Sequence, residues 1–166
     1  MLEKQIEKKF EKDIKDNELL IYKVCGIYAF NTDDRKDLFQ EIVIQLWKAY
    51  PKFKGEASFS TWLYRVAINT AITGLRRKKD MISSVEPSSM PIDIKDDNHW
   101  AEEEERLQQM YRAIEKLNEI EKAIVMLYME DRSYEEMEEI LGISQGTLRV
   151  KMTRIKDKLR ELTKNN

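Results

Sequence analysis

The sequence predicts an all-α fold. Apolar residues recur at helical spacing along nearly the whole chain of 166 residues. No segment alternates convincingly between apolar and polar residues as a half-buried strand would, and the five glycines are scattered rather than grouped at hairpin turns. The expected architecture is therefore two small helical domains joined by a flexible linker.

The first domain is expected over residues 1–80. Two amphipathic helices are predicted over 2–16 and 17–30, and a third from about Asp33 to Tyr50, where Pro51 stops it. A wide apolar face on this third helix is expected to be buried; it consists of Leu38, Phe39, Ile42, Val43, Leu46 and Trp47. A fourth helix is predicted to start near Ser58 to Ser60 and to end near Lys79.

Residues 81–100 have the composition of a linker. Serines, prolines and aspartates replace the helical pattern, as at Ser83, Ser84, Pro87 and Pro91. The second domain is expected over residues 101–166, beginning with a helix over 101–117 and, after Asn118, a helix centred on 123–128.

A helix-turn-helix is predicted in the second domain. Ser133 and Glu136 have the spacing of a capping box, Gly142 can end the helix that this box opens, and Ser144 can cap the next one. Two short helices joined by a tight turn containing glycine are typical of the motif that places its second helix in the DNA major groove.

The last helix has the pattern of a helix that binds in the DNA major groove. Its apolar residues form one narrow stripe: Leu148, Met152, Ile155, Leu159 and Leu162. Small or short residues are expected opposite that stripe, between two rows of Arg and Lys, and residues 145–164 hold seven basic residues against two acidic ones. Cations at the phosphates and short side chains at the base edges suit duplex DNA. The alternative is an ordinary solvated helix face.

A second basic segment lies between Lys52 and Lys79, where seven basic residues oppose Glu56 alone. Aromatic residues are interleaved with these charges: Phe53, Phe59, Trp62 and Tyr64. Cations that follow a backbone, together with rings on which bases stack, are typical of single-stranded DNA binding. The alternative is that the rings pack in the core.

The sequence contains no motif typical of several classes of enzyme or metal-binding protein. There is no phosphate-binding loop, no zinc spacing and no nucleophile elbow, and both Cys25 and His99 are solitary. We therefore expect no catalytic activity, metal or cofactor. No apolar run approaches about 18 residues and no signal-peptide core is present, which predicts a cytoplasmic protein without membrane insertion of its own.

Two groups of motifs resemble the extracytoplasmic-function (ECF) group of bacterial RNA polymerase sigma factors. Asp37 to Glu41, Trp47 and the run from Phe53 to Asn69 resemble region two of that group, and the segments 133–136, 141–144 and 146–149 resemble region four. The likeness covers about residues 18–79 and 102–162. The helix over 2–16 has no recognised motif, and Thr73 and Val150 depart from the residues common in the group.

The resemblance implies partners and site residues. The partners would be core RNA polymerase, promoter DNA as duplex and as melted non-template strand, and an anti-sigma factor. The implied polymerase-binding residues are Asp37, Gln40, Glu41, Ile44 and Lys48. The candidate minus-ten residues are Lys52, Phe53, Lys54, Ser60, Trp62, Arg65, Asn69 and Arg76. The candidate minus-thirty-five residues are Gln145, Thr147, Arg149, Val150, Lys151, Thr153 and Arg154.

Two other functions are open at this point. A stand-alone helix-turn-helix regulator would use residues 1–80 to sense a ligand or to dimerise, and would bind a palindromic duplex tightly without polymerase. A purely helical interaction protein, such as a sigma antagonist, would need no basic rows on its last helix.

Overall fold

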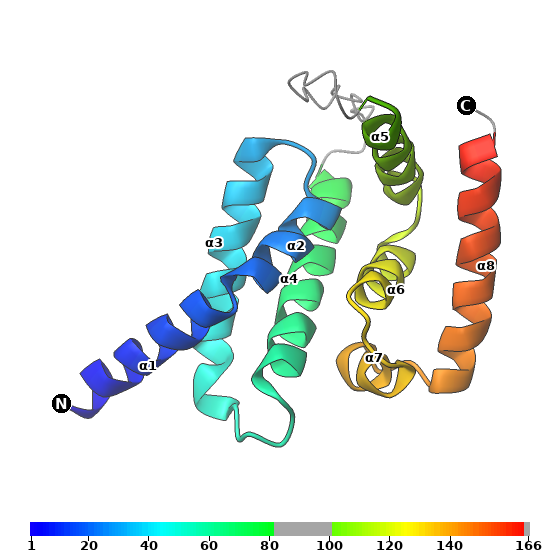
Figure 1. Cartoon of the computed structure of the whole chain (residues 1–166). Coiled ribbons are helices and arrows are strands. Elements are labelled where there is room, and N and C mark those ends of the chain that lie inside the picture. Colours follow the sequence, from blue (N-terminus) through cyan, green and yellow to red (C-terminus); the bar gives the residue numbers. More distant parts are fainter. Residues whose placement is uncertain (82–100, 165–166) are drawn as a thin grey trace. The chain divides into compact units, whose positions relative to one another are not determined.

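A computed structural model describes residues 1–81 and 101–164 of the chain, and every regular element in these residues is helical (Figure 1). The predicted all-α fold class is confirmed. The chain divides into two compact units, Met1–Ser88 and Ser89–Asn166. The predicted flexible linker falls almost entirely on residues 82–100, which lie outside the described residues.

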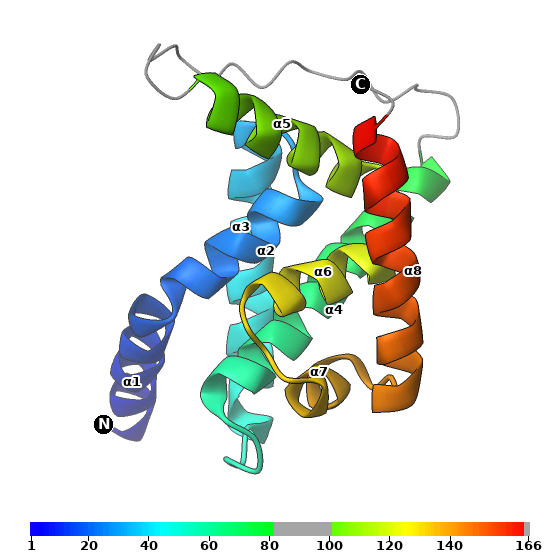
Figure 2. The same ribbon diagram turned by 45° about the vertical axis from the view of Figure 1, so that its right-hand side comes forward.

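The first unit contains α1 (Leu2–Asp16), α2 (Glu18–Tyr28), α3 (Thr32–Ala49), a 3-10 turn η1 (Tyr50–Lys52) and α4 (Phe59–Met81). Helices α3 and α4 run side by side and are joined at one end by the loop after η1, while α2 packs across both (Figures 1 and 2). Asn31 opens α3 by accepting a hydrogen bond from the Asp34 amide at 2.8 Å. Ser58 Oγ accepts the Thr61 amide at 3.2 Å near the start of α4.

The core of the first unit lies between α2, α3 and α4. Its fully buried large side chains include Ile21, Val24, Ile42, Leu46, Leu63, Tyr64 and Ile68. Ile21 and Val24 are three residues apart, and Ile42 and Leu46, like Tyr64 and Ile68, are four apart, with Leu63 beside Tyr64. Each helix therefore turns one apolar face inward and removes it from water. Most of the predicted face of α3 is buried or half-buried, but Trp47 is 41% exposed, contrary to expectation.

Helix α1 is held to this core by Phe10. The Phe10 ring is buried and lies 5.0 Å, centroid to centroid, from the rings of both Trp47 and Tyr50. The Tyr50 hydroxyl donates to Asp13 Oδ2 at 2.8 Å. Trp47 is therefore partly exposed because it lies at the edge where α1 joins the bundle, and beyond Phe10 the helix extends away from α2–α4 (Figure 1).

The second unit contains α5 (Ala101–Glu115), α6 (Glu119–Met129), α7 (Tyr134–Leu141) and α8 (Gln145–Lys164). Helix α8 packs on each of the other three. The full capping box is at Asn118 and Glu121, which opens α6. At α7, Ser133 accepts the Glu136 amide as predicted, but the Glu136 carboxylate bonds Arg132 Nη1 at 3.2 Å instead of completing a box.

Within the described residues, none of the helices is long and apolar enough to cross a membrane.

Candidate nucleic-acid interface

Helix α8 presents the two faces that its sequence predicts. Leu148, Met152 and Ile155 are buried, and Leu159 and Leu162 continue the stripe half-buried. On the opposite side the candidate minus-thirty-five residues Arg149, Val150, Thr153 and Arg154 are exposed, together with Thr147. Val150 is 52% exposed, which is unusual for a β-branched apolar residue and leaves its methyl groups accessible to a partner.

Three contacts fix the start of α8. Gly142 ends α7 in the left-handed conformation, with φ of 71°. Ser144 Oγ accepts the Thr147 amide at 3.3 Å and donates to Thr147 Oγ1 at 2.8 Å. The Glu138 carboxylate on α7 accepts the Gln145 amide at 3.2 Å. The two helices are therefore joined by a side-chain bond as well as by the turn, and the Thr147 hydroxyl already has a partner inside the protein.

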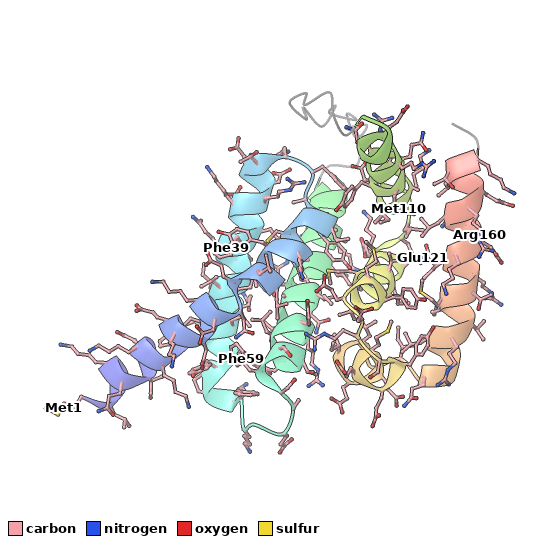
Figure 3. All side chains as sticks on the ribbon, viewed as in Figure 1. Met1, Phe39, Phe59, Met110, Glu121 and Arg160 are labelled. Atoms are coloured by element: carbon pink, nitrogen blue, oxygen red, sulfur yellow. The ribbon has the colours of Figure 1, made fainter. Side chains whose placement is uncertain are left out.

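The basic residues of α8 fall into two classes. Lys156 Nζ bonds the Tyr128 hydroxyl at 3.1 Å and lies 4.7 Å from that ring's centroid. Lys158 Nζ pairs with Glu121 Oε1 at 3.2 Å, and Arg160 lies 3.6 Å from Asp157. Figure 3 labels Glu121 on α6 and Arg160 on α8, the two helices that the Lys158–Glu121 pair joins.

Arg149, Lys151 and Arg154 are different, because none of them has a carboxylate partner among the described residues. Lys156 and Lys164 in the second half of α8 also lack a carboxylate partner among the described residues, but the first half of the helix, residues 145–154, holds three cations and no acidic residue of its own. This is the half that a helix-turn-helix directs at base edges.

In the first unit, the loop after η1 is closed by packed rings. Phe53, Phe59 and Trp62 lie 5.0 to 5.8 Å from one another, and Trp62 is 6.2 Å from Tyr50. Edge-to-face and tilted contacts at such distances are favourable, so the three half-buried rings hold the loop against α4. Tyr64 is fully buried, so its ring is a core residue and offers no surface for a base.

A groove of about 540 Å³ lies between α3 and α4. Asn69 and Thr73 of α4 line it, and Glu41 of α3 lines its other wall. The remaining lining residues are Gln45, Ala49, Val66, Thr70, Gly74 and Arg77. Asn69 is exposed rather than sealed in the bundle. The groove is open, and the amide, hydroxyl and charged groups along it can bond the edge of a small planar polar molecule.

The candidate minus-ten residues are not all gathered in this groove. Lys52 and Lys54 are exposed on the loop, Ser60 lies near the start of α4 with its Oγ 3.3 Å from that of Ser58, and Arg65 and Arg76 are exposed along α4. Of the eight candidates only Asn69 lines the groove. Sequence reasoning missed Gln45 and Thr70 and counted Arg77 only as part of a charge run. Gln45 lies one turn after Glu41 and Arg77 about two turns after Asn69, so helical spacing could have indicated these two, whereas Thr70 is adjacent to Asn69 and had no such signal.

The candidate polymerase-binding residues lie along one exposed side of α3. Asp37, Gln40, Glu41, Ile44 and Lys48 are all exposed, and Ile44 is 47% accessible. The Glu41 carboxylate accepts a hydrogen bond from Gln45 Nε2 at 3.0 Å. Glu41 thus belongs both to this side of α3 and to the wall of the groove.

Cys25 lies in the core of the first unit. Burial raises the pKa of its thiol to about 11, against a smaller opposing effect of Arg35. The pKa of Tyr50 is raised to about 12 by burial and by its hydrogen bond to Asp13. Among the residues described, no three His, Cys, Asp or Glu side chains are grouped to hold a metal ion.

Comparison with known proteins gives two family matches. The model of Sigma-70 region 2 matches residues 14–80, and that of Sigma-70, region 4, matches residues 107–159. The chain is 30% identical over 135 residues to the ECF RNA polymerase sigma-E factor of Escherichia coli strain K12, with 75% of this chain and 71% of that protein covered. It is 29% identical over 150 residues to the ECF RNA polymerase sigma-E factor of Haemophilus influenzae, covering 81% and 78%.

Solved structures show the same fold. The sigma factor RpoE from Bartonella quintana, crystallised with the anti-sigma factor NepR, has a TM-score of 0.73 at 19% identity, with 95% of this chain and 98% of that chain covered. CnrH in complex with the cytosolic domain of CnrY has a TM-score of 0.68 at 16% identity, with 96% and 90% covered. With both family models matched in order and a relative at this identity, the chain belongs to the sigma-70 family as an ECF RNA polymerase sigma factor, a non-enzymatic transcription initiation factor that binds core polymerase and promoters.

Proposed function

We propose that the second unit of this sigma factor reads the minus-thirty-five element through the first half of α8. The observation that carries this assignment is the group of uncompensated cations Arg149, Lys151 and Arg154 around the exposed Val150 and Thr153. Arg149 is near enough to the helix start to bond a guanine, Val150 can contact a thymine methyl, and Lys151 and Arg154 reach phosphates. Gln145 and Thr147 act at the helix start, where a phosphate or base edge would meet them.

The first unit is assigned the melted non-template strand of the minus-ten element. Lys52, Lys54, Arg65 and Arg76 follow the sugar–phosphate backbone. Asn69 bonds a flipped base in the groove between α3 and α4, whose polar lining supplies donors and acceptors for a base edge. Ser60 flanks the loop, and the packed rings of Phe53 and Trp62 keep that loop in place and offer their half-exposed edges to the strand.

The exposed side of α3 is assigned to core polymerase through Asp37, Gln40, Glu41, Ile44 and Lys48. It combines an accessible aliphatic residue with charges of both signs, as protein interfaces of moderate affinity do. Because Glu41 also lines the groove, polymerase docking and strand capture would meet along one wall of α3.

Residues 1–80 and 101–166 act as two separate binding domains, and residues 81–100 set the spacing between them. Once the first contact is made on polymerase, the second becomes intramolecular, so two weak DNA contacts give a selective complex. The protein works in the cytoplasm, where its polymerase is. An anti-sigma factor is proposed as its inhibitor, since the RpoE protein of the same fold was crystallised with the anti-sigma factor NepR.

Run-off transcription with purified core polymerase tests the minus-thirty-five assignment. The Arg149→Ala/Arg154→Ala variant is expected to lose promoter selectivity while still binding core polymerase. Arg160→Ala is the matched control, because Arg160 is already paired with Asp157 further along the same helix, and it should transcribe like the parent. Equal activity of the double variant and the control would refute the assignment.

A single-stranded probe tests the minus-ten assignment. Holoenzyme is titrated with a fluorescent non-template oligonucleotide carrying the minus-ten element. Asn69→Ala should weaken binding by about 1–3 kcal/mol, because a buried base edge loses its partner. The control is Lys36→Ala, which removes an exposed cation near the start of α3 outside the groove. An unchanged affinity of the Asn69→Ala variant for the oligonucleotide would mean that the strand does not bind in the groove.

A further inference from the structure

We propose that Tyr134, the first residue of α7, is a positioning residue that holds the Arg149 side chain in place for base recognition. This inference rests on the proposed reading of the minus-thirty-five element by α8. Neither the motifs nor the candidate residues derived from the sequence assign Tyr134 a role in DNA recognition.

The geometry joins the two helices of the motif. The Arg149 guanidinium carbon lies 5.2 Å from the centroid of the Tyr134 ring, within the range of a cation–π contact. Tyr134 is half-buried, so its ring is backed by the protein, whereas Arg149 is exposed. Tyr134 follows the helix cap Ser133, whose bond to the Glu136 amide fixes the backbone from which the ring projects.

The ring is the only side chain in the described residues that restrains this guanidinium, since Arg149 has no carboxylate partner there. A guanidinium held over a ring by a cation–π contact can still direct its N–H groups at a base. These are the groups that bond guanine O6 and N7 as a pair. A long side chain that is already ordered loses less conformational entropy on binding than a mobile one, so stacking on Tyr134 favours the bidentate contact.

The same unit contains a natural control. Lys156 lies over the ring of Tyr128 at 4.7 Å and also bonds its hydroxyl at 3.1 Å. This second pair also joins a cation of α8 to a tyrosine of an earlier helix. However, it lies in the second half of α8, further from the end that enters the groove, and a lysine provides no bidentate fork for a base. Removing the Tyr128 ring should therefore leave base discrimination unchanged.

The test uses holoenzyme on a selected promoter in which each base pair of the minus-thirty-five element is substituted in turn. Arg149→Ala first identifies the base pair at which discrimination is lost. Tyr134→Leu should then reduce discrimination at that same base pair by about two- to fivefold, the range expected for an exposed cation–π contact. Tyr134→Phe keeps the ring and should retain the parental value, and Tyr128→Leu should change no base preference.

A double variant separates positioning from direct contact. Once Arg149 is replaced by Ala, adding Tyr134→Leu should have no further effect on base preference. An added loss in that background would mean that Tyr134 contacts the DNA itself, which overturns the inference. Loss of discrimination in Tyr134→Phe as well as in Tyr134→Leu would overturn it too, because the ring would not be what matters.

Failure of the proposed function has a different signature. If Arg149→Ala changes no base preference, both the minus-thirty-five role of Arg149 and the inference are wrong. If Arg149→Ala does change it and Tyr134→Leu does not, only the inference is wrong. Urea unfolding of each variant is measured in parallel, and base preference is taken as the ratio between two promoters for the same variant, so that a loss of stability, which affects both promoters alike, cancels.

Discussion

The candidate nucleic-acid surfaces of the two units have opposite shapes. In the second unit the candidate surface is the convex side of a single helix, and its residues are close in sequence. In the first unit it is a groove between two helices, and its walls, at Glu41 and Asn69, come from segments separated by a loop. A surface on one helix follows from the helical period of apolar and polar residues, whereas a concave surface depends on how helices pack.

Charge is also handled differently in the two units. On α8 the second half contains two cations with carboxylate partners, Lys158 with Glu121 and Arg160 with Asp157. No cation of the first half has a carboxylate partner among the described residues. In the first unit three packed aromatic rings organise the loop beside the basic residues. A count of cations therefore overstates the number available for DNA in the second unit, and a count of aromatics overstates the stacking surfaces in the first.

The largest expected effect tests whether the two units are independent. Leu148 is fully buried at the centre of the second unit, so Leu148→Ala should cost about 2–5 kcal/mol in free energy of unfolding. Amide hydrogen exchange should show lost protection in α5–α8 and normal protection in α2–α4. Leu63→Ala, at an equally buried position in the first unit, should show the reverse pattern. Loss in both units from either variant would show that they fold as one.

The next effect separates the two classes of cation on α8. Arg154→Ala should weaken binding of holoenzyme to the minus-thirty-five duplex and lower the slope of log affinity against log salt by about one, as removal of one phosphate contact does. Lys158→Ala should change that slope less, because Glu121 already neutralises Lys158. Equal changes in slope for the two variants would mean that the ion pair with Glu121 does not lower the contribution of Lys158 to DNA binding.

Two glycines should respond with opposite sign. Gly142 ends α7 at φ of 71°, so Gly142→Ala should destabilise the second unit by about 1 kcal/mol. Gly74 lies inside α4 with open space where a Cβ would be, so Gly74→Ala should stabilise the first unit by up to about 1 kcal/mol. Urea denaturation measures both changes. A loss of stability in Gly74→Ala would mean that this part of α4 is not an ordinary helix interior.

The smallest expected effect is a loss of stability of the first unit at alkaline pH. The folded pKa of the Cys25 thiol is raised from 9.0 to about 11, so the neutral thiol is favoured in the folded state. The contribution of this thiol to the free energy of unfolding is fully present below pH 9. It is lost as pH rises through about 11, because the thiol ionises at lower pH in the unfolded chain than in the folded one. Cys25→Ala should flatten the stability profile over this range. A native thiol that reacts rapidly with a thiol reagent at neutral pH would contradict its burial.

Much of the fold followed from local pattern. The starts of α3, α4 and α8 lie within one or two residues of the predicted positions, because Asn31, Ser58 and Ser144 cap them through bonds only three residues long. The predicted stop of α7 at Gly142 is confirmed for the same reason, since a left-handed residue ends a helix whatever surrounds it.

Tertiary contacts decided the rest. Trp47 was expected in the core, but α1 packs over it through Phe10 at the edge of the bundle. Tyr64 was expected among the rings open to DNA, but it points into the core. Each of these outcomes depends on which of several competing partners is nearest in space, and spacing along the chain does not specify that.

By itself the sequence determined the helices, the buried stripe and exposed side of α8, and the sigma factor motifs, because helical period and capping act over three to seven residues. The tertiary structure alone decided which cations remain uncompensated and where a groove opens. The partners of Lys156 and Lys158 lie 28 and 37 residues away in the chain, and the groove forms only where α3 and α4 come together. Contacts over such separations are set by the packing of whole helices, which is the physical reason that local pattern leaves them open.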